Sequence, residues 1–440
     1  MKKILIWLLF FVGLFTVLGF WYSGLYSSSV NSNISLFKNI SSLGALLAVY
    51  FILWQIILIS RASWVEQTFG FDKLSVAHHY GGIISTIFIL IHGIFIVSAF
   101  AITQNISILT QFVKFFSNDE LLSAIISSFL FITIVVISLT IVFKRLKYEN
   151  WYYIHIITYV AIALAFGHQL EIGHDFQNSF VFKIIWIAMY IFALGNLIWC
   201  RFSRPIINLY KYSFEVSRIE KDTDESVSIY IKGNRISEFK IEAGQFVIFR
   251  FLQKGFWKEA HPFSISSGIN SNELRITVKN LGDFTANISK LKLKTKILID
   301  GPLGIFTKKV LKSKKVLLIA GGVGITPVYS LASELLSLGI DVSLLYSSKE
   351  SKSIILKSDI DILSENYSNF KKHFIISNDE SWDGEKGRIN IEKINHLAPD
   401  FLEREVYICG PKGMTSSVVD NLKELGIKKD KIHFERFSFS

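Results

Sequence analysis

Cysteine is almost absent from this sequence. Only Cys200 and Cys409 occur among the 440 residues, one in each half of the chain. A framework of disulfide bonds is therefore excluded, and so is a metal or iron–sulfur site rich in cysteine. Internal repeats and low-complexity segments are lacking as well.

A concentrated basic surface is also lacking, although the formal net charge is +11. The lysines are scattered, and no basic face with interleaved aromatic residues can be traced. The charge therefore does not indicate nucleic-acid binding, and basic residues at membrane edges and around anionic cofactors explain it more simply. No feature of the sequence indicates an obligatory protein partner.

Apolar residues are abundant, at 50% of the chain, and they form long runs up to about Cys200. Six of these runs are long enough to cross a lipid membrane. The first follows Lys2 and Lys3 and lacks a small-residue cleavage site, so we expect a retained anchor rather than a signal peptide. The expected spans are Ile4–Phe20, Leu43–Ile59, Tyr80–Ile102, Leu121–Phe143, Tyr152–Leu170 and Phe180–Trp199.

The charges in the loops predict how the spans are oriented. Lysine and arginine gather on one side of the expected spans, whereas the opposite loops carry few of them. The positive-inside rule then places both termini and the second half of the chain in the cytoplasm, and we expect an integral plasma membrane protein. The residues on the basic side are Lys2, Lys3, Arg61, Lys73, Lys144, Arg145, Lys147, Arg201 and Arg204.

Four histidines stand on two of the expected spans. His78 and His92 are 14 residues apart, about 21 Å along a helix, and that spacing places them on one face. His155 and His168 repeat the arrangement on the fifth span. The predicted orientation pairs His78 with His155 near the cytoplasm and His92 with His168 near the exterior. Opposed neutral imidazoles are the axial ligands that six-coordinate haem iron needs.

Two details of this histidine pattern stay open. His79 could replace His78 as a ligand, although its spacing to His92 rotates it off the shared face. His155 and His168 are only 13 residues apart, so their helix needs a kink, a bulge or a tilted approach. Nearby glycines would admit a flat macrocycle or, equally, close helix packing. They are Gly81, Gly82, Gly93 and Gly167.

Short alternating segments between Tyr212 and Asp300 predict a small antiparallel barrel. The expected strands are Ser226–Ile231, Gln245–Phe251, Leu274–Val278 and Thr295–Ile299. Within this region lie the runs HPFSISS from His261, GDFT from Gly282 and GPLG from Gly301. Their hydroxyls and their backbone amides after a proline-fixed turn suit phosphate oxygens and a flavin edge.

Beyond Lys312 the pattern changes to alternating strands and helices. A buried strand, Val316–Ala320, leads into the run GGVGITP from Gly321 and then into a helix. Such a turn directs amide groups and a helix N-terminus at a pyrophosphate, although it is neither a G-x-G-x-x-G fingerprint nor a P-loop. Further strands are expected at Asp341–Tyr346 and Val406–Cys409, the second ending in the run CGPKGM.

Taken in order, these motifs resemble the ferric reductase and NADPH oxidase family of membrane flavocytochromes, over nearly the whole chain. The resemblance implies a multidomain membrane protein with a six-helix transmembrane haem domain at residues 1–205. A ferredoxin-reductase-like module would follow, with an antiparallel β-barrel FAD domain at 206–311 and an α/β parallel-sheet nicotinamide-binding domain at 312–440.

The resemblance also assigns roles to individual residues. His261, Pro262, Phe263, Ser264 and Ser267 would line FAD, and Gly282, Phe284 and Thr285 would hold its pyrophosphate. The nicotinamide dinucleotide would contact Gly322, Gly324, Thr326 and Pro327, with Cys409, Gly410 and Pro411 near the nicotinamide. Phe439 is the expected aromatic that stacks on the flavin, with Phe437 as second choice. The metal ligands would be His78, His92, His155 and His168, holding two b-type haems.

A 2′-phosphate needs hydroxyl and cationic partners at the end of the second strand of the nicotinamide-binding domain. Ser347, Lys349 and Arg388 supply such groups, so we expect NADPH, with NADH possible. A solvated lysine and a surface arginine are the alternative interpretation.

The resulting hypothesis is transmembrane electron transfer from NAD(P)H through FAD and two haems to an external acceptor. We expect molecular oxygen, giving superoxide, and keep ferric chelates as the alternative, because Ile96 stands where animal oxidases carry an extra histidine. A transporter with a regulatory nucleotide domain is the rival of a different class. The sequence shows no signs of broken helices and no charged residues in the middle of the expected spans, and this argues against it. A haem-binding conduit without catalysis is a further rival, disfavoured by the flavin and nicotinamide motifs.

Overall fold

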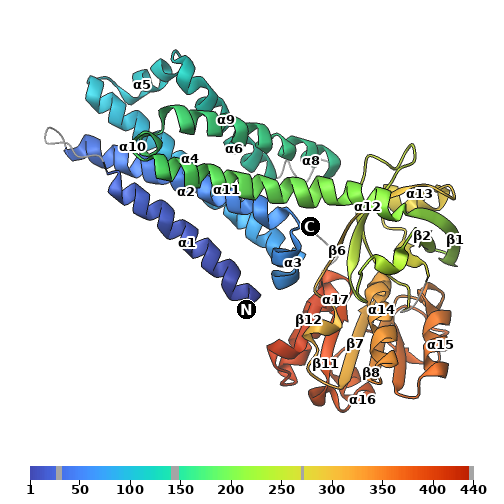
Figure 1. Cartoon of the computed structure of the whole chain (residues 1–440). Helices are drawn as coiled ribbons and strands as arrows, with labels where there is room; N and C mark the ends of the chain where they lie inside the picture. Colours follow the sequence, from blue (N-terminus) through green and yellow to red (C-terminus); the bar gives the residue numbers. More distant parts are fainter. Residues whose placement is uncertain (26–31, 140–147, 269–271, 436–440) are drawn as a thin grey trace. The chain divides into compact units, whose positions relative to one another are not determined.

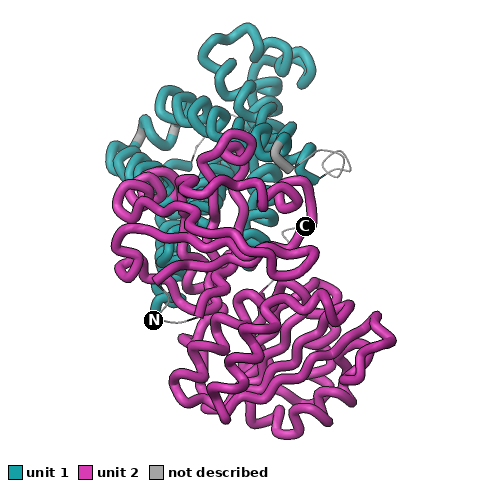
Figure 2. Tube along the Cα trace, turned by 90° about the vertical axis from the view of Figure 1, so that its right-hand side faces the viewer, with its two compact units in different colours: residues 1–65, 73–200 teal, residues 66–72, 201–440 magenta. Residues whose placement is uncertain are grey.

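The computed structural model describes residues 1–25, 32–139, 148–268 and 272–435. The chain forms two compact units, drawn in separate colours in Figure 2. The first contains residues 1–65 and 73–200, and the second contains residues 66–72 and 201–440. The end of the fourth expected span and the basic residues Lys144, Arg145 and Lys147 lie outside the described residues.

The first unit is a bundle of apolar helices (Figure 1). Within the described residues, six helical stretches are long and apolar enough to cross a membrane, which confirms the predicted six spans. α6 packs against α9, and α1 and α11 pack against α2. The bounds are α1 (Lys2–Ser23), α2 (Ser32–Ile59), α3 (Ser63–Phe69), α4 (Phe71–Gln104), α5 (Ile108–Phe115), α6 (Asp119–Leu139), α8 (Tyr148–Ile156), α9 (Thr158–Ile172), α10 (His174–Asn178) and α11 (Phe180–Ile198).

The third span is longer than predicted. α4 begins at Phe71 rather than at Tyr80, and it continues without interruption to Gln104. His78 and His92 therefore stand on one continuous helix, where a 14-residue spacing keeps both on the same face.

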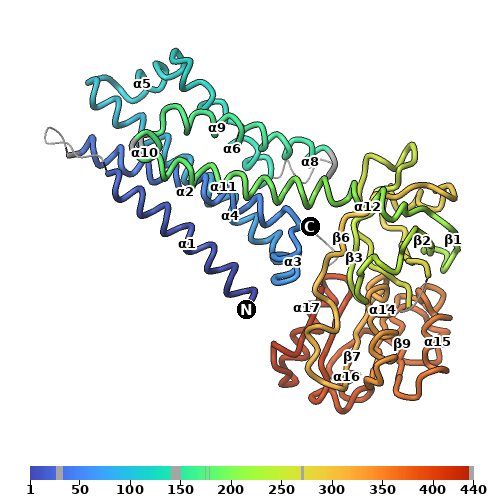
Figure 3. Tube along the Cα trace, viewed as in Figure 1, coloured from blue at the N-terminus to red at the C-terminus, as the bar shows by residue number. Residues whose placement is uncertain are grey.

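The fifth span consists of two helices, α8 and α9, which are labelled in Figure 3. The interruption falls between its two histidines. α8 ends at Ile156 and α9 begins at Thr158. At the junction the Ile157 amide donates to the Ile154 carbonyl at 3.1 Å, a bond that spans three residues instead of four. The Thr158 hydroxyl donates to the His155 carbonyl at 2.7 Å. This irregular turn is the kind of break that a 13-residue spacing requires.

The second unit begins with a barrel of two antiparallel sheets, in the orders β1-β2-β5 and β4-β3-β6. Bridges from Glu215 to Lys296 and from Ile265 to Ile276 join them around one apolar core. The strands are β1 (Glu215–Thr223), β2 (Ser226–Lys232), β3 (Phe246–Phe251), β4 (His261–Ser264), β5 (Leu274–Lys279) and β6 (Ile297–Leu303), preceded by α12 (Arg204–Tyr212). The predicted barrel is confirmed, although β1 and β4 had not been expected as strands.

A six-stranded parallel sheet in the order β10-β9-β8-β7-β11-β12 follows the barrel. α14 and α15 pack on one face, and α16 and α17 pack on the other. This arrangement confirms the predicted α/β domain. The strands are β7 (Lys315–Gly321), β8 (Asp341–Ser348), β9 (Phe370–Ile376), β10 (Glu385–Lys386), β11 (Glu405–Cys409) and β12 (Ile432–Glu435), and the helices are α13 (Asp283–Asn287), which belongs to the barrel, α14 (Ile325–Ser337), α15 (Lys357–Asn366), α16 (Ile391–Leu397) and α17 (Lys412–Glu424).

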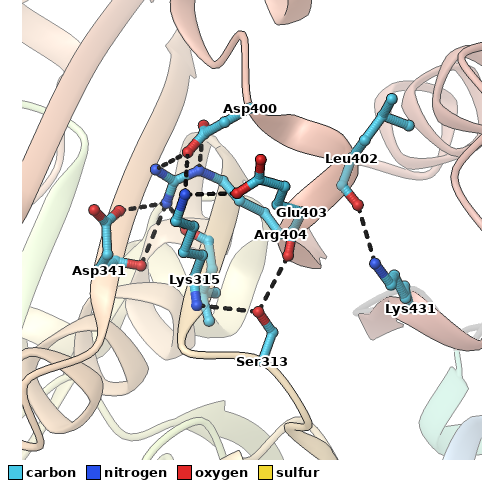
Figure 4. A network of polar contacts seen from close by, with 9 residues as sticks. Ser313, Lys315, Asp341, Asp400, Leu402, Glu403, Arg404 and Lys431 are labelled. Atoms are coloured by element: carbon cyan, nitrogen blue, oxygen red, sulfur yellow. Dashed lines mark hydrogen bonds and ion pairs between the residues drawn. The ribbon is translucent and has the colours of Figure 1, made fainter.

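A buried arginine ties together the amino-terminal ends of the central strands (Figure 4). The Arg404 guanidinium donates to Asp400 Oδ1 at 2.7 Å, and also to the Val316 and Asp341 carbonyls at 3.1 and 3.3 Å. This guanidinium lowers the pKa of Asp400, which stays ionised as its partner. The network lies opposite the carboxyl ends of the strands, so it supports the sheet rather than a ligand.

Residues 66–72 follow the second span in sequence but belong to the second unit. The Phe71 ring lies 6.3 Å from the ring of Phe246 on β3, and the Gly304 amide donates to the Glu66 carboxylate at 2.7 Å. The sequence had placed this segment with the spans, because nothing in its short pattern reveals a partner more than 200 residues away.

Candidate functional site

One histidine pair joins α4 to α8. The ring centroids of His78 and His155 lie 5.9 Å apart, and the Trp151 ring stacks on His155 at 5.1 Å. His79 is exposed and meets the neighbouring Tyr80 ring edge to face instead. Of the two candidates on α4, His78 is therefore the one that faces His155.

The second pair joins α4 to α9. The two rings are close enough for His168 to act electrostatically on His92. His92 Nδ1 lies 3.0 Å from the carbonyl oxygen of Ser41 on α2, and the Ser41 hydroxyl donates to the His92 carbonyl at 3.0 Å. The Ser41 hydroxyl oxygen also lies 2.9 Å from Nδ1. A proton on Nδ1 satisfies both oxygen atoms, because each can accept, and this tautomer leaves the Nε2 lone pair for a metal ion. Sequence reasoning missed Ser41, since a lone serine in an apolar span carries no such signal.

The surroundings of the histidines fit a bound prosthetic group. Nδ1 of His78, His155 and His168 is buried and has no hydrogen-bond partner among the described residues. No described atom comes within 4 Å of a Cβ built on Gly93 or Gly167, beside the second pair. Gly81 and Gly82 instead face the Gln55 side chain, which indicates helix packing there. Paired imidazoles with adjoining space suit six-coordinate haem iron.

The HPFS run forms β4 rather than a turn. β4 is the edge strand of its sheet, where Pro262 does not interrupt the hydrogen-bond ladder. Ser264 Oγ is buried without a hydrogen-bond partner in the described part of the chain. His261 Nε2 lies 2.9 Å from a Glu259 carboxylate oxygen, and Phe263 packs on the barrel core. A buried hydroxyl without a hydrogen-bond partner in the described part of the chain can form a hydrogen bond with a bound flavin.

The GDFT run forms a tight turn at the start of α13. The Gly282 and Leu281 amides both donate to Thr285 Oγ1, at 3.0 and 2.9 Å. Phe284 is 9% exposed and packs against Phe256, with its ring centroid 3.9 Å from that of His261. Its side chain thus belongs to the barrel core, and the backbone turn remains as the part of this motif that can hold phosphate.

The glycine-rich turn after β7 meets the turn after β11. A Cβ built on Gly324 would lie 2.3 Å from the Cys409 carbonyl oxygen, and one built on Gly410 would lie 3.1 Å from the Gly321 amide nitrogen. Pro411 also approaches Gly321. The structure therefore brings together the two motifs that the sequence assigned to the nicotinamide dinucleotide.

The same edge of the sheet supplies the remaining nicotinamide candidates. Gly322 has a positive φ of 53° with open space beside it, and Thr326 and Pro327 lie in the first turn of α14. The Thr326 hydroxyl donates to the Val323 carbonyl at 2.9 Å. Burial raises the pKa of the Cys409 thiol, so this group stays protonated and is a poor nucleophile.

Ser347, Lys349 and Arg388 lie at the carboxyl ends of β8 and β10, two strands on either side of β9. Ser347 is near the end of β8, Lys349 directly follows that strand, and Arg388 follows β10 after Gly387, whose amide donates to Ile376 of β9 at 2.8 Å. Lys349 and Arg388 are exposed, as groups that bind a soluble phosphate must be.

Sequence reasoning missed a buried arginine behind the flavin motif. Arg275 Nη2 donates to the Ser266 carbonyl at 2.6 Å, and Nη1 donates to Asp359 Oδ1 on α15 at 2.9 Å. The guanidinium also lies 5.4 Å from the Tyr329 ring of α14. It thus joins the HPFSISS run to the helices of the nicotinamide-binding domain. Phe439 and Phe437 lie outside the described residues.

Three family models match the chain in the expected order. They are the ferric reductase like transmembrane component at residues 44–166, the FAD-binding domain at 211–307 and the oxidoreductase NAD-binding domain at 318–420. The chain is therefore an oxidoreductase with FAD- and NAD(P)-binding domains. Its architecture is that of the ferric reductase and NADPH oxidase-like proteins, and together with the six apolar helices it marks a membrane protein.

Two curated relatives resemble parts of the chain. The plasma membrane-associated coenzyme Q6 reductase of Saccharomyces cerevisiae is 31% identical over 201 residues, which are 44% of this chain and 64% of that protein. The glycine betaine monooxygenase reductase subunit of Pseudomonas aeruginosa is 34% identical over 144 residues, 32% of this chain and 39% of that protein. The chain thus spans less than two thirds of either relative. Among solved structures, the ferredoxin reductase in carbazole 1,9a-dioxygenase is 22% identical with a TM-score of 0.45, covering 51% of this chain and 68% of that one.

Proposed function

We propose that this protein carries electrons across a membrane from NAD(P)H to an acceptor on the opposite side. FAD and two bis-histidine b-type haems, when bound, supply the redox chemistry. The family models support an oxidoreductase with a transmembrane component. We infer the haems, the direction of electron transfer and the acceptor in addition.

The observation that carries the proposal is the histidine arrangement of the first unit. The ring centroids of His78 on α4 and His155 on α8 lie 5.9 Å apart, and His168 on α9 acts electrostatically on His92 of α4. Ser41 fixes one tautomer, and buried ring nitrogens without partners remain at the other three histidines. His78 with His155 and His92 with His168 would each provide both axial ligands of one iron.

The second unit would receive the electron donor. Ser264, Ser267 and the Gly282–Thr285 turn are the proposed FAD contacts, whereas the β7 and β11 turns would hold the dinucleotide. Lys349 and Arg388 would favour NADPH by pairing with its 2′-phosphate. Phe439 remains the proposed aromatic that stacks on the flavin.

The loop charges support a plasma membrane protein whose termini and reductase lie in the cytoplasm. His78 and His155 would then be the inner pair, on the donor side, and His92 and His168 the outer pair, on the acceptor side.

We propose molecular oxygen as the acceptor, with superoxide as the product. A ferric chelate is the second candidate, because apolar Ile96 follows His92 by four residues and offers no polar group to oxygen. The matched transmembrane model, described as ferric reductase like, also favours this second candidate.

The test is anaerobic reduction of the purified protein loaded with FAD and haem. NADPH should produce the spectrum of reduced low-spin haem, at about two haems per chain by the proposed ligand sets. Absence of haem after full reconstitution would overturn the proposal and favour the transporter rival. Superoxide-dismutase-sensitive reduction of cytochrome c, compared with reduction of ferric citrate, then decides the acceptor.

A further inference from the structure

The function proposed above gives no role to two buried glutamates in the second unit, one of which, Glu435, pairs in register with Cys409. Glu66 is 0% exposed on α3, and Glu435 is 9% exposed at the end of β12. The Oε2 atom of each carboxyl group is buried and has no hydrogen-bond partner among the described residues. A buried carboxylate oxygen without a partner is costly, so each group has reason to carry a proton.

Both carboxyl groups lie against the same residue, Gly304. Its amide donates to Glu66 Oε1 at 2.7 Å, and a Cβ built on it would come within 3.0 Å of Glu435 Oε1. Gly304 has a positive φ of 100°, so the turn that follows β6 presents its backbone to both acids without an intervening side chain. Two acids from distant parts of the chain are thereby packed around one turn.

The charged groups around the pair do not neutralise it. Arg204 on α12 faces Glu66, but its guanidinium donates to Asp300 of β6 at 3.0 Å. Asp72, in the first turn of α4, adds a further negative charge that acts on both glutamates. Among the described residues, Arg204 thus offsets the charge of Glu66 while already paired with Asp300, and Glu435 has Glu66 and Asp72 as charged neighbours, so protonation is favoured.

We propose that Glu66 and Glu435 form a proton-binding site that holds residues 66–72 in the second unit. Each carboxylate takes up one proton from water as the pH falls and returns it as the pH rises, and no electron moves in this step. With a proton on each, both acids are neutral and stay buried without an ionic partner. With both ionised, they repel each other and the segment is held less firmly.

The direction of the pH dependence follows from burial. Burial raises the pKa of Glu66 from 4.5 to about 7, against the opposing effects of the Gly304 amide and Arg204. Burial, followed by the charges of Glu66 and Asp72, also raises the pKa of Glu435. Because these folded-state pKa values lie above that of a free carboxyl, the segment is held most firmly below about 4.5 and loosens as the pH rises through about 7.

The position of the segment gives the site a consequence for electron transfer, and this consequence rests on the proposed function. Residues 66–72 run directly into α4, where His78 stands on the second helical turn. Loosening the segment would loosen the connection between the reductase and the helix that carries the inner ligand. Electron transfer to the haems should then slow as the pH rises.

The first experiment needs no haem. In the full-length protein with FAD, infrared difference spectra on titration should show a protonated-carboxyl C=O band that disappears as the pH rises through about 7. Glu66→Gln and Glu435→Gln should each change this band, whereas Glu424→Gln, an exposed glutamate on α17, should not. If neither substitution changes the carboxyl band, or if only one of them does, the proposal that Glu66 and Glu435 form one proton-binding site is overturned.

Hydrogen exchange of the peptide covering residues 63–72 measures how firmly the segment is held. After correction for intrinsic exchange, its protection should fall between about pH 4.5 and about pH 7, by up to about tenfold per pH unit for each proton released on loosening. Glu66→Gln keeps an oxygen for the Gly304 amide and cannot ionise, so it should flatten this dependence. Equal protection at all pH values in the parent protein would overturn the proposal, and retained FAD content would show that each variant has folded.

The second experiment follows flavin oxidation by haem in stopped flow. Loss of rate above about pH 7 in the parent protein, but not in Glu66→Gln, would confirm the consequence. If the haem-free measurements succeed while no haem is ever reduced, the proton site stands and the proposed function fails. If haem is reduced at a rate that the pH and both variants leave unchanged, the electron-transfer consequence fails.

Discussion

The two units place their candidate residues by different means. In the first unit, helix periodicity positions four imidazole side chains, and the backbone around them is ordinary helix except at Ile157. In the second unit, the nicotinamide turns work through backbone, because Gly324 touches the Cys409 carbonyl with no room for a side chain. Function in the first unit should therefore depend on the identity of side chains. Function at the nicotinamide turns of the second unit should depend on the space around the backbone.

The largest expected effect is the loss of a whole cofactor. His92→Leu or His168→Leu keeps an apolar helix but removes one axial ligand, so one of the two proposed haems should be lost while NADPH still reduces the flavin. Haem-to-flavin stoichiometry measures this. His79→Leu, at an exposed position on the same helix as His92, should retain both haems. Two haems in His92→Leu would show that the pairing is wrong.

The second-largest effect is expected from a substitution that displaces the backbone in the second unit. In Gly324→Ala the new Cβ would lie 2.3 Å from the Cys409 carbonyl, so the turn must shift. A displacement of about 1 Å costs roughly a hundredfold in rate, so anaerobic flavin reduction by NADPH should slow by that order. Gly413→Ala, on α17 with open space beside it, is the matched control and should react normally. An undiminished rate in Gly324→Ala would contradict the claim that the nicotinamide turns depend on the space around their backbone.

A side-chain change at the rim of the same site should have a smaller effect. Arg388→Gln removes a cation that we expect on the 2′-phosphate, and a lost charge-assisted bond of about 1.5 kcal/mol corresponds to roughly tenfold in KM for NADPH. The KM for NADH and the kcat should stay unchanged. Lys423→Gln, an exposed lysine of α17, serves as control. An equal change for both nucleotides would remove Arg388 from the phosphate site.

The smallest effect is expected at the break in the fifth span. Thr158→Val removes the hydroxyl that bonds the His155 carbonyl at 2.7 Å, so the free energy of unfolding should fall by about 1 kcal/mol with haem content unchanged. Thr103→Val removes a similar bond, to the Ala99 carbonyl, inside the unbroken α4. Such a bond adds little to a regular helix, so this control should be near neutral in thermal unfolding. A larger loss in Thr103→Val would contradict the stabilising role of Thr158.

Local pattern made much of the fold predictable. Apolar runs located the spans. β7, β8 and β11 could be predicted as buried strands because each is an apolar run followed by a turn rich in glycine or serine. The 13-residue interval between His155 and His168 even required an irregular turn, which the chain forms at Ile157. Each of these inferences depends on residues close together in sequence.

What could not be predicted depends on distant partners. The contact of Glu66 with Gly304, the support of His92 by Ser41 and the bonds of Arg275 to Ser266 and Asp359 arise only when the chain has folded. β1 was missed because its strand is rich in charged residues. The burial of Phe284 could not be predicted either, because a motif does not show which side of the backbone faces the core.

The buried Arg404 carries a consequence for the order in which the parallel sheet assembles. It is 88 residues from Val316 and 63 from Asp341, yet it bonds the carbonyl groups of both. Closing such long loops costs entropy that is recovered only when the late contact forms. During synthesis, β7 and β8 are made well before this residue, and β11 inserts beside β7 only after it. We therefore expect the nicotinamide-binding domain to reach its native state cooperatively, and only after Arg404 and β11 have been made.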